Sequence, residues 1–98
     1  MLYKAKKNKS NEEQRIEEVL TWKNKIVNHF KGDKYIIEDF ATYSEDLNKK
    51  MVIYRALYGE CELYVRPLDM FCEKCNELQY EEFKQEYRFE LERIESVR

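Results

Sequence analysis

Glycine, proline and histidine are scarce in this chain of 98 residues, which has two glycines, one proline and one histidine. The sequence contains no Walker phosphate loop and no GxGxxG fingerprint. A general-base mechanism would have to centre on His29 or on a carboxylate. Because His29 lies beside Phe30 and a turn, a hydrogen-bonded structural role is the simpler interpretation. We therefore expect that the protein is not an enzyme.

Long apolar runs and an excess of one charge are also missing. No segment approaches the roughly 18 consecutive apolar residues of a membrane helix, and no apolar region follows the basic start MLYKAKKNKS, as a secretory signal requires. We expect a cytoplasmic protein that does not bind membranes. The formal net charge of −2 argues against bulk electrostatic binding of nucleic acid, although a local basic patch would permit it.

Cysteine is present in an odd number, as Cys61, Cys72 and Cys75. This fits reduced thiols better than a disulfide framework. Cys72 and Cys75 form a single CxxC, so a zinc site would need Cys61 and His29 from distant segments. A thioredoxin-like pair would need a βαβ context that the chain lacks. We expect no metal site and no cofactor.

Aromatic residues are abundant, with eight tyrosines and five phenylalanines, and they predict a folded chain despite the high charged fraction. The length predicts one domain, residues 1–98, with a core of modest size. Residues 1–9 are lysine-rich and lack periodicity, which predicts a flexible basic tail. The alternative is a basic arm that contacts a phosphate backbone through its lysines, which are Lys4, Lys6, Lys7 and Lys9.

Helical patterns occur near both ends of the chain. Ser10 and Glu13 form a capping box, and the apolar residues that follow at helical spacing predict a helix over residues 11–25. After Phe71 there is neither glycine nor proline, and apolar residues recur at spacings of three, four, four and three: Tyr80, Phe83, Tyr87, Leu91 and Ile94. This stripe predicts a helix over residues 77–95, which either packs on the core or mediates a homodimer.

The segment between these helices predicts strands. Residues 26–30 look extended, Gly32 lies in a turn, and residues 35–43 are rich in β-forming side chains. Residues 51–58 are apolar on both faces, which is typical of an interior strand.

A turn at Gly59 leads from that interior strand into the next one. We expect Leu63 and Val65 to point inward on this strand, which ends at Pro67 because proline has no N–H to donate. Residues 68–71 then predict a short helical turn.

Three motifs in this segment carry a family resemblance: HFKG at residues 29–32, YRALYG at residues 54–59 and LYVRPLDMF at residues 63–71. In this order and spacing they resemble the bacterial DUF1653 family. The resemblance covers residues 26–72 and implies a small SH3-like antiparallel β-barrel with no assigned activity. The fold class that we predict is therefore α+β, in which this barrel is flanked by an N-terminal helix and a C-terminal helix.

The chain departs from the family pattern in two places. Tyr64 stands where the family commonly has tryptophan, which puts in doubt any role that needs an indole. The family also usually ends in another strand, and residues 88–90 could be a remnant of it. In that case the helix predicted over residues 77–95 would break there.

Arg55 and Arg66 lie among hydrophobic residues, and an arginine is rarely buried without a partner. Guanidinium groups suit phosphate and carboxylate, so one interpretation is an anion-binding cleft. The residues expected to line it are Arg55, Arg66, Tyr58, Tyr64, His29, Lys31 and Tyr35. The alternative is an internal network in which Arg55 pairs with Glu38, Asp39 or Asp69.

We expect a non-enzymatic binding module that recognises a protein segment or a small anionic ligand in this Tyr/Arg-lined groove. One alternative is a nucleotide or nucleic-acid binding protein, because tyrosine rings also provide a surface on which bases stack. It would use Arg55, Arg66 and the lysine-rich arm. A second alternative is a small homo-oligomeric regulatory or assembly protein that dimerises through its C-terminal helix.

Overall fold

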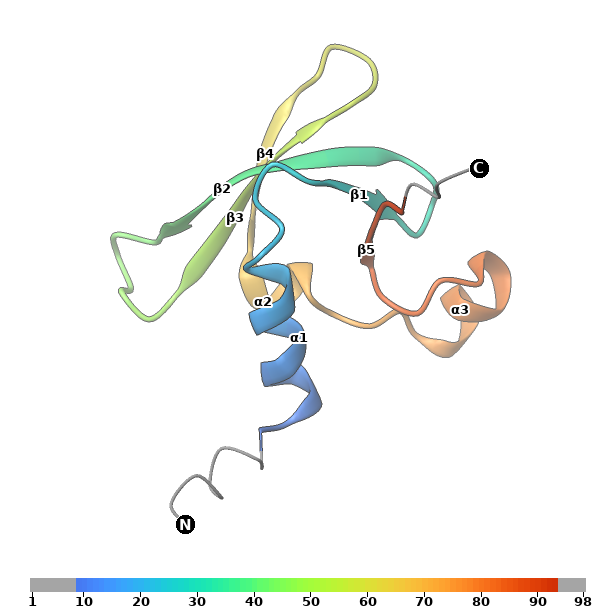
Figure 1. Cartoon of the computed structure of the whole chain (residues 1–98), viewed down its shortest axis with the longest axis horizontal. Coiled ribbons are helices and arrows are strands. Elements are labelled where there is room, and N and C mark those ends of the chain that lie inside the picture. The colour runs from blue at the N-terminus through green and yellow to red at the C-terminus, as the bar shows by residue number, and fades with distance from the viewer. Residues whose placement is uncertain (1–8, 94–98) are drawn as a thin grey trace, which may run out of the picture.

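The computed structural model describes residues 9–93 and shows an α+β fold, as the sequence predicts (Figure 1). Within these residues, three helices and five strands follow in the order α1 (Asn11–Val19), β1 (Ile26–His29), β2 (Lys34–Thr42), β3 (Lys50–Ala56), β4 (Leu63–Pro67), α2 (Leu68–Phe71), α3 (Glu77–Phe83) and β5 (Phe89–Leu91). No helix within residues 9–93 is long and apolar enough to cross a membrane.

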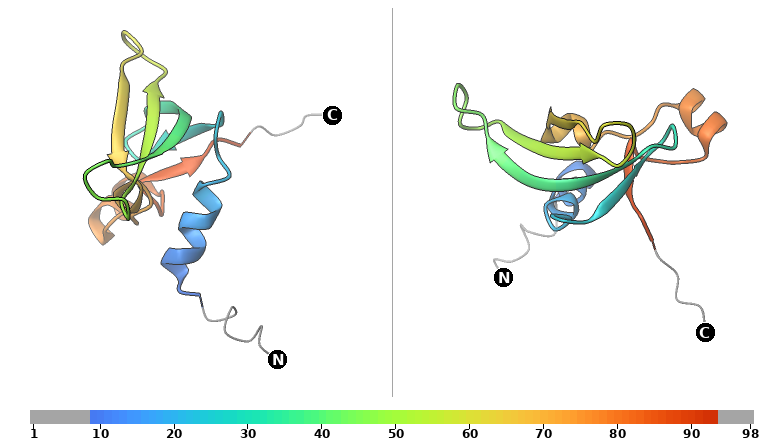
Figure 2. Two further views of the ribbon diagram at one scale, coloured as in Figure 1. Left: turned by 90° about the vertical axis from the view of Figure 1, so that its left-hand side faces the viewer. Right: turned by 90° about the horizontal axis from the view of Figure 1, so that it is seen from above.

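The five strands form one antiparallel sheet in the order β4-β3-β2-β1-β5. The sheet curls strongly (Figure 2), and the register shift between Ile37 and Asp39 in β2 places a bulge where such a bend is expected. The predicted SH3-like barrel is not confirmed, because the sheet is open. Within residues 9–93, β4 and β5 are its two edges and do not pair with each other.

The core lies on one face of the sheet, which we call the inner face. Val27 of β1, Ile37 of β2 and Val52 of β3 are fully buried there. They pack against side chains of α1, α2, β5 and the segment after α1: Val19, Trp22, Leu68, Phe71 and Phe89. Burying each large apolar side chain stabilises the fold by roughly 1.5–3 kcal/mol, so this cluster holds α1 and α2 on the sheet.

Helix α1 begins as predicted and ends early. Ser10 accepts a hydrogen bond from the backbone N–H of Glu13, whose carboxylate reaches back to the Ser10 N–H, so the capping box is confirmed. The helix ends at Val19 instead of residue 25. The chain turns here because Trp22 enters the core and Asn24 adopts a left-handed conformation, with φ of 67°. The Asn24 N–H then donates to the Ile37 carbonyl at 2.7 Å.

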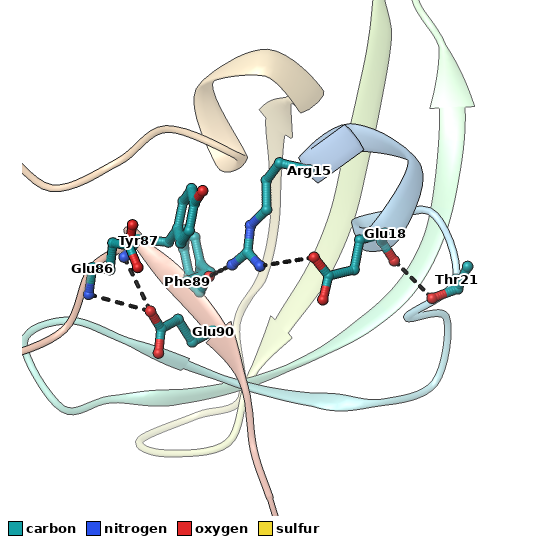
Figure 3. Close-up of polar contacts among 7 residues, drawn as sticks. All are labelled: Arg15, Glu18, Thr21, Glu86, Tyr87, Phe89 and Glu90. Carbon is teal, nitrogen blue, oxygen red and sulfur yellow. Dashed lines mark hydrogen bonds and ion pairs between the residues drawn. The ribbon is translucent and has the colours of Figure 1, made fainter. Parts of the chain in front are cut away.

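Helix α1 is tied to β5 by Arg15 (Figure 3). The Arg15 Nη2 donates to the Phe89 carbonyl at 2.8 Å, and Nη1 contacts the Glu18 carboxylate at 3.3 Å. The guanidinium carbon lies 3.8 Å from the centre of the Tyr87 ring, within cation–π distance. The hydrogen bond from Arg15 to the Phe89 carbonyl joins residues 74 positions apart and fixes α1 against β5.

The helix predicted over residues 77–95 is wrong beyond its first two turns. Helix α3 ends at Phe83, where Lys84 takes a left-handed conformation with φ of 59°, and β5 follows at residues 89–91. Phe89 explains the break: it is 2% exposed and stacks on Phe71 with ring centres 4.0 Å apart. β5 also supplies the hydrogen-bonding partner of β1. Residues 94–95 of the predicted helix, like residues 1–8 of the predicted tail, lie outside the described residues.

The orientation predicted for β4 is also wrong. Leu63 and Val65 are 47% and 60% exposed and lie on the outer face of the sheet. The register explains this, because Tyr64 lies opposite Tyr54, and Arg66 lies opposite the fully buried Val52. Tyr64 and Arg66 therefore belong to the inner face.

Candidate functional site

A surface rich in tyrosine occupies part of the inner face. We call it the Tyr–Arg face and define it by His29, Tyr35, Tyr54, Tyr58, Tyr64 and Arg66. The register places these residues together, since His29 pairs with Phe89, Tyr35 pairs with Ala56, and Tyr54 pairs with Tyr64. Strand alternation then directs their side chains to the same side of the sheet. Besides Arg66, four of the predicted site residues lie on this face: His29, Tyr35, Tyr58 and Tyr64.

Tyr35 is the central ring of this face. Its ring centre lies 5.3 Å from Tyr54, 5.6 Å from Tyr58 and 6.2 Å from Tyr64, all in edge-to-face geometry. The hydroxyls of Tyr35 and Tyr58 share a hydrogen bond of 2.9 Å. Burial, together with this hydrogen bond, raises the pKa of Tyr35. Burial also raises the pKa of Tyr64. Protonated hydroxyls therefore line the face at neutral pH, and they can donate to an acceptor.

Arg66 is the charged residue of the face. Its Nε donates to the Tyr54 hydroxyl at 3.1 Å, and its guanidinium carbon lies 5.8 Å from the centre of the Phe89 ring. The ion pairs found within residues 9–93 do not include Arg66. Arginine carries five N–H donors in a planar fork. The remaining donors of Arg66 are therefore not committed to a carboxylate of the described chain.

His29 lies at the margin of this face in a positive environment. Burial, together with the nearby positive charges of Arg88, Arg66 and Lys31, lowers the pKa of His29 to about 4. The imidazole is therefore neutral at pH 7. Its Nδ1 accepts a hydrogen bond from the Lys31 backbone N–H at 3.1 Å, which places the proton on Nε2. Nε2–H is thus a neutral donor beside three cationic side chains.

Arg55 does not belong to this face. It pairs with Leu63 in the β3–β4 register, which places it on the outer face. Its Nε contacts the Glu38 carboxylate at 2.6 Å, and its Nη1 donates to the Cys61 carbonyl at 3.0 Å. The expectation that Arg55 and Arg66 converge is wrong, and the alternative pairing of Arg55 with Glu38 is confirmed. Strand alternation is the physical reason: in the β3–β4 hairpin Arg55 lies at a position of the outer face, whereas Arg66 lies at a position of the inner face.

Three residues near the face were not predicted. Tyr54 contributes both a ring and the hydroxyl that orients Arg66, Phe89 contributes the ring beneath them, and Arg88 contributes a positive charge near His29. Tyr54 has the same strand parity as Tyr58, so alternation alone could have identified it. Phe89 and Arg88 lie in the segment that resembles a helix in sequence, and only the family's usual last strand hinted at their position. Lys31, which was predicted, is exposed, with its Nζ 5.8 Å from the centre of the Phe30 ring.

Two of the three cysteines, Cys72 and Cys75, are partly buried. Burial raises the pKa of Cys72 to about 11 and also raises that of Cys75, so both thiols are protonated at neutral pH. Within the described part of the chain, no cluster of three or more His, Cys, Asp or Glu side chains is arranged to hold a metal ion.

Comparison with known proteins places the chain in a family. No curated protein and no solved structure matches it. The family described as "Protein of unknown function (DUF1653)" matches residues 25–91, which run from just before β1 to the end of β5. The match includes every residue of the Tyr–Arg face and excludes α1. The chain belongs to the DUF1653 family.

Proposed function

We propose that the protein is a non-enzymatic binding module, and that its Tyr–Arg face receives a carboxylate or phosphate group of a ligand, anchored by Arg66. One observation carries the proposal. Arg15, Arg55 and Arg88 each contact a carboxylate, at 3.3, 2.6 and 2.7 Å respectively. Arg66 is instead held by the neutral hydroxyl of Tyr54.

The surroundings of Arg66 suit such a group. A guanidinium binds carboxylate or phosphate through two parallel N–H donors. The hydroxyls of Tyr58 and Tyr64 and the Nε2–H of His29 add neutral donors without adding negative charge. The positive charges that lower the pKa of His29 also favour an anion at this position.

The rings define the rest of the ligand. Tyr54 is 4% exposed and supports the neighbouring rings from the core. Tyr35 and Tyr64 are less buried and present aromatic surface on the same face as Arg66, which favours a planar or apolar group adjacent to the anion. A nucleotide supplies this combination through its phosphate and base, and a protein segment supplies it through an acidic side chain with an aromatic neighbour. The chemistry at Arg66 is the same in both cases, and the experiment separates them.

The experiment is a titration of the isotope-labelled protein followed by NMR, at constant ionic strength. The probes are inorganic phosphate, AMP and a short extended peptide that carries glutamate two residues before tyrosine. We expect chemical-shift changes at His29, Tyr64 and the Arg66 Nε–H. The class of ligand is then identified by which of the two organic probes, AMP or the peptide, binds more tightly. Arg66→Gln should abolish the changes at His29 and Tyr64.

The matched control is Arg55→Gln, which removes the same charge from the outer face and should leave the response intact. An equal loss of response in both variants would show that the response depends on the net charge of the protein and not on the position of Arg66. Wild-type protein that responds to none of the three probes would contradict the proposal.

A further inference from the structure

Strand β4 is an edge strand whose outward side is uncovered in the described part of the chain (Figure 2, left). The Ala56 N–H donates to the Glu62 carbonyl at 2.9 Å, so the ladder with β3 continues to Glu62. In an antiparallel ladder the backbone groups of alternate residues point to the same neighbour. Glu62, Tyr64 and Arg66 therefore bond toward β3. The N–H and C=O groups of Leu63 and Val65 point away from the sheet.

This edge has little protection against pairing with another strand. Proteins usually block edge strands with charged side chains, prolines or covering elements. In β4 the three residues at the exposed end are Leu63, Tyr64 and Val65, which are 47%, 40% and 60% exposed. Pro67 blocks only the far end of the strand. The edge is therefore able to accept an additional strand over residues 62–66.

We propose that the ligand of the Tyr–Arg face is β4 of a second copy of this chain, paired antiparallel with β4 about a two-fold axis at Tyr64. This inference rests on the proposed function, because it names the anionic group that Arg66 receives: the carboxylate of Glu62 in the second copy. The two open sheets then join into one continuous sheet through their β4 edges.

The sequence of the strand is complementary to itself in this register. Leu63 of one copy lies opposite Val65 of the other, twice, and these are the residues whose backbone groups point outward, so each pair exchanges two hydrogen bonds. Tyr64 lies opposite Tyr64. Glu62 lies opposite Arg66, also twice, on the same face, and directly opposed side chains in an antiparallel pair have Cβ atoms about 4.5–5.5 Å apart.

Neighbouring registers lack this complementarity. Centring the pair on Val65 would place Arg66 opposite Tyr64 and would oppose Leu63 to Pro67, which has no N–H to donate. Centring it on Leu63 would place Arg66 opposite Glu60, which lies in the turn and not in the strand. The register about Tyr64 therefore satisfies both the backbone and the charges.

The test uses charge reversal in the full chain, with oligomeric state measured by sedimentation velocity over a series of concentrations. Wild-type protein should dimerise. Glu62→Arg creates two Arg–Arg pairs and Arg66→Glu creates two Glu–Glu pairs, so each variant should weaken self-association by at least about tenfold. An equimolar mixture of the two variants should form a heterodimer, because both cross-strand pairs are then opposite in charge again.

Two controls keep the test specific. Glu60→Arg makes the same charge change in the turn and should dimerise like the wild type. Val65→Pro removes an outward-facing N–H without changing charge and should also prevent dimerisation, while near-ultraviolet circular dichroism of Trp22 and the tyrosines verifies that each variant is folded.

A wild-type protein that stays monomeric, or a mixture of the two charge variants that stays monomeric, would overturn the inference. The proposed function fails separately. If the monomeric protein binds phosphate or AMP through Arg66, the anion site stands and only the second copy is wrong. If charge complementation restores the dimer and neither small anion nor the short peptide binds, the β4 pairing stands and the ligand site of the proposed function is wrong.

Discussion

Arg15 and Arg66 both lie close to Phe89 and have contrasting environments. The Arg15 side chain is 11% exposed and contacts a carboxylate, a backbone carbonyl and the Tyr87 ring (Figure 3). Its guanidinium also lies over the Trp22 ring. Arg66 is half-buried on the inner face and donates one hydrogen bond to a neutral hydroxyl. The first guanidinium is engaged within the fold. The second retains donors for a group from outside.

The comparison shows that two arginines over aromatic rings can differ in the acceptors that their guanidinium groups contact. Both residues lie over aromatic rings, so a cation–π contact by itself does not distinguish them. The difference lies in the acceptors: Arg15 contacts charged and backbone oxygens, whereas Arg66 contacts the Tyr54 hydroxyl. Arg15 also belongs to α1, which lies outside the family match, whereas Arg66 lies within it.

Replacing Phe89 should disturb the surroundings of both Arg15 and Arg66. We expect it to give the largest loss in the free energy of unfolding. Phe89→Ala removes a fully buried ring that stacks on Phe71, and deleting such a ring costs about 3–5 kcal/mol of the free energy of unfolding. Urea denaturation followed by Trp22 fluorescence measures the loss. Leu78→Ala, at a position 80% exposed, is the control and should change stability by less than about 0.5 kcal/mol. Equal losses in the two variants would contradict the placement of Phe89 in the core.

Matched substitutions of the two arginines should separate their roles. Arg15→Met leaves the Phe89 carbonyl without its charged donor and should lower the free energy of unfolding by about 2 kcal/mol. Arg66→Met loses one hydrogen bond to a hydroxyl and should lower it by about 1 kcal/mol or less. Only Arg66→Met should abolish the response to phosphate. A larger loss of stability in Arg66→Met than in Arg15→Met would reverse the assignment.

Acidification should destabilise the protein through His29. Its folded-state pKa is about 4, below the ordinary value of 6.5, so between these values the unfolded chain binds the proton more readily. Stability from the neutral imidazole is therefore present above pH 6.5 and is lost as the pH falls through about 4. His29→Gln removes this contribution. The wild type should lose more stability than the variant between pH 7 and pH 4.5 in urea denaturation, and parallel curves would contradict the lowered pKa.

The sequence predicts the local features well and the long-range register poorly. The capping box at Ser10, the end of β4 at Pro67 and the family resemblance are carried by neighbouring residues. Neighbouring residues do not show which side chains of β4 face the core, because Leu63, Tyr64 and Val65 are all apolar enough to point inward. Only pairing with β3 decides between them, and a shift of one residue reverses every side chain.

The prediction of a single helix over residues 77–95 was wrong for a related reason. The stripe that includes Tyr80, Phe83 and Tyr87 has helical spacing, and it is followed within the same run by Phe89, which belongs to a strand. That strand exists because β1 offers a partner about 60 residues earlier, which no local pattern reveals. The same lack of register led to the expectation that Arg55 joins Arg66.

The most direct measurement is the pKa of His29, determined by NMR in the presence and absence of phosphate, in wild-type protein and in Arg66→Gln. An anion bound at Arg66 offsets the positive charges that depress this pKa, so phosphate should raise it from about 4 in the wild type. In Arg66→Gln the pKa should start higher, because one of those positive charges is gone, and phosphate should leave it unchanged. The same rise with phosphate in both proteins would contradict the assignment of Arg66 as the anion anchor.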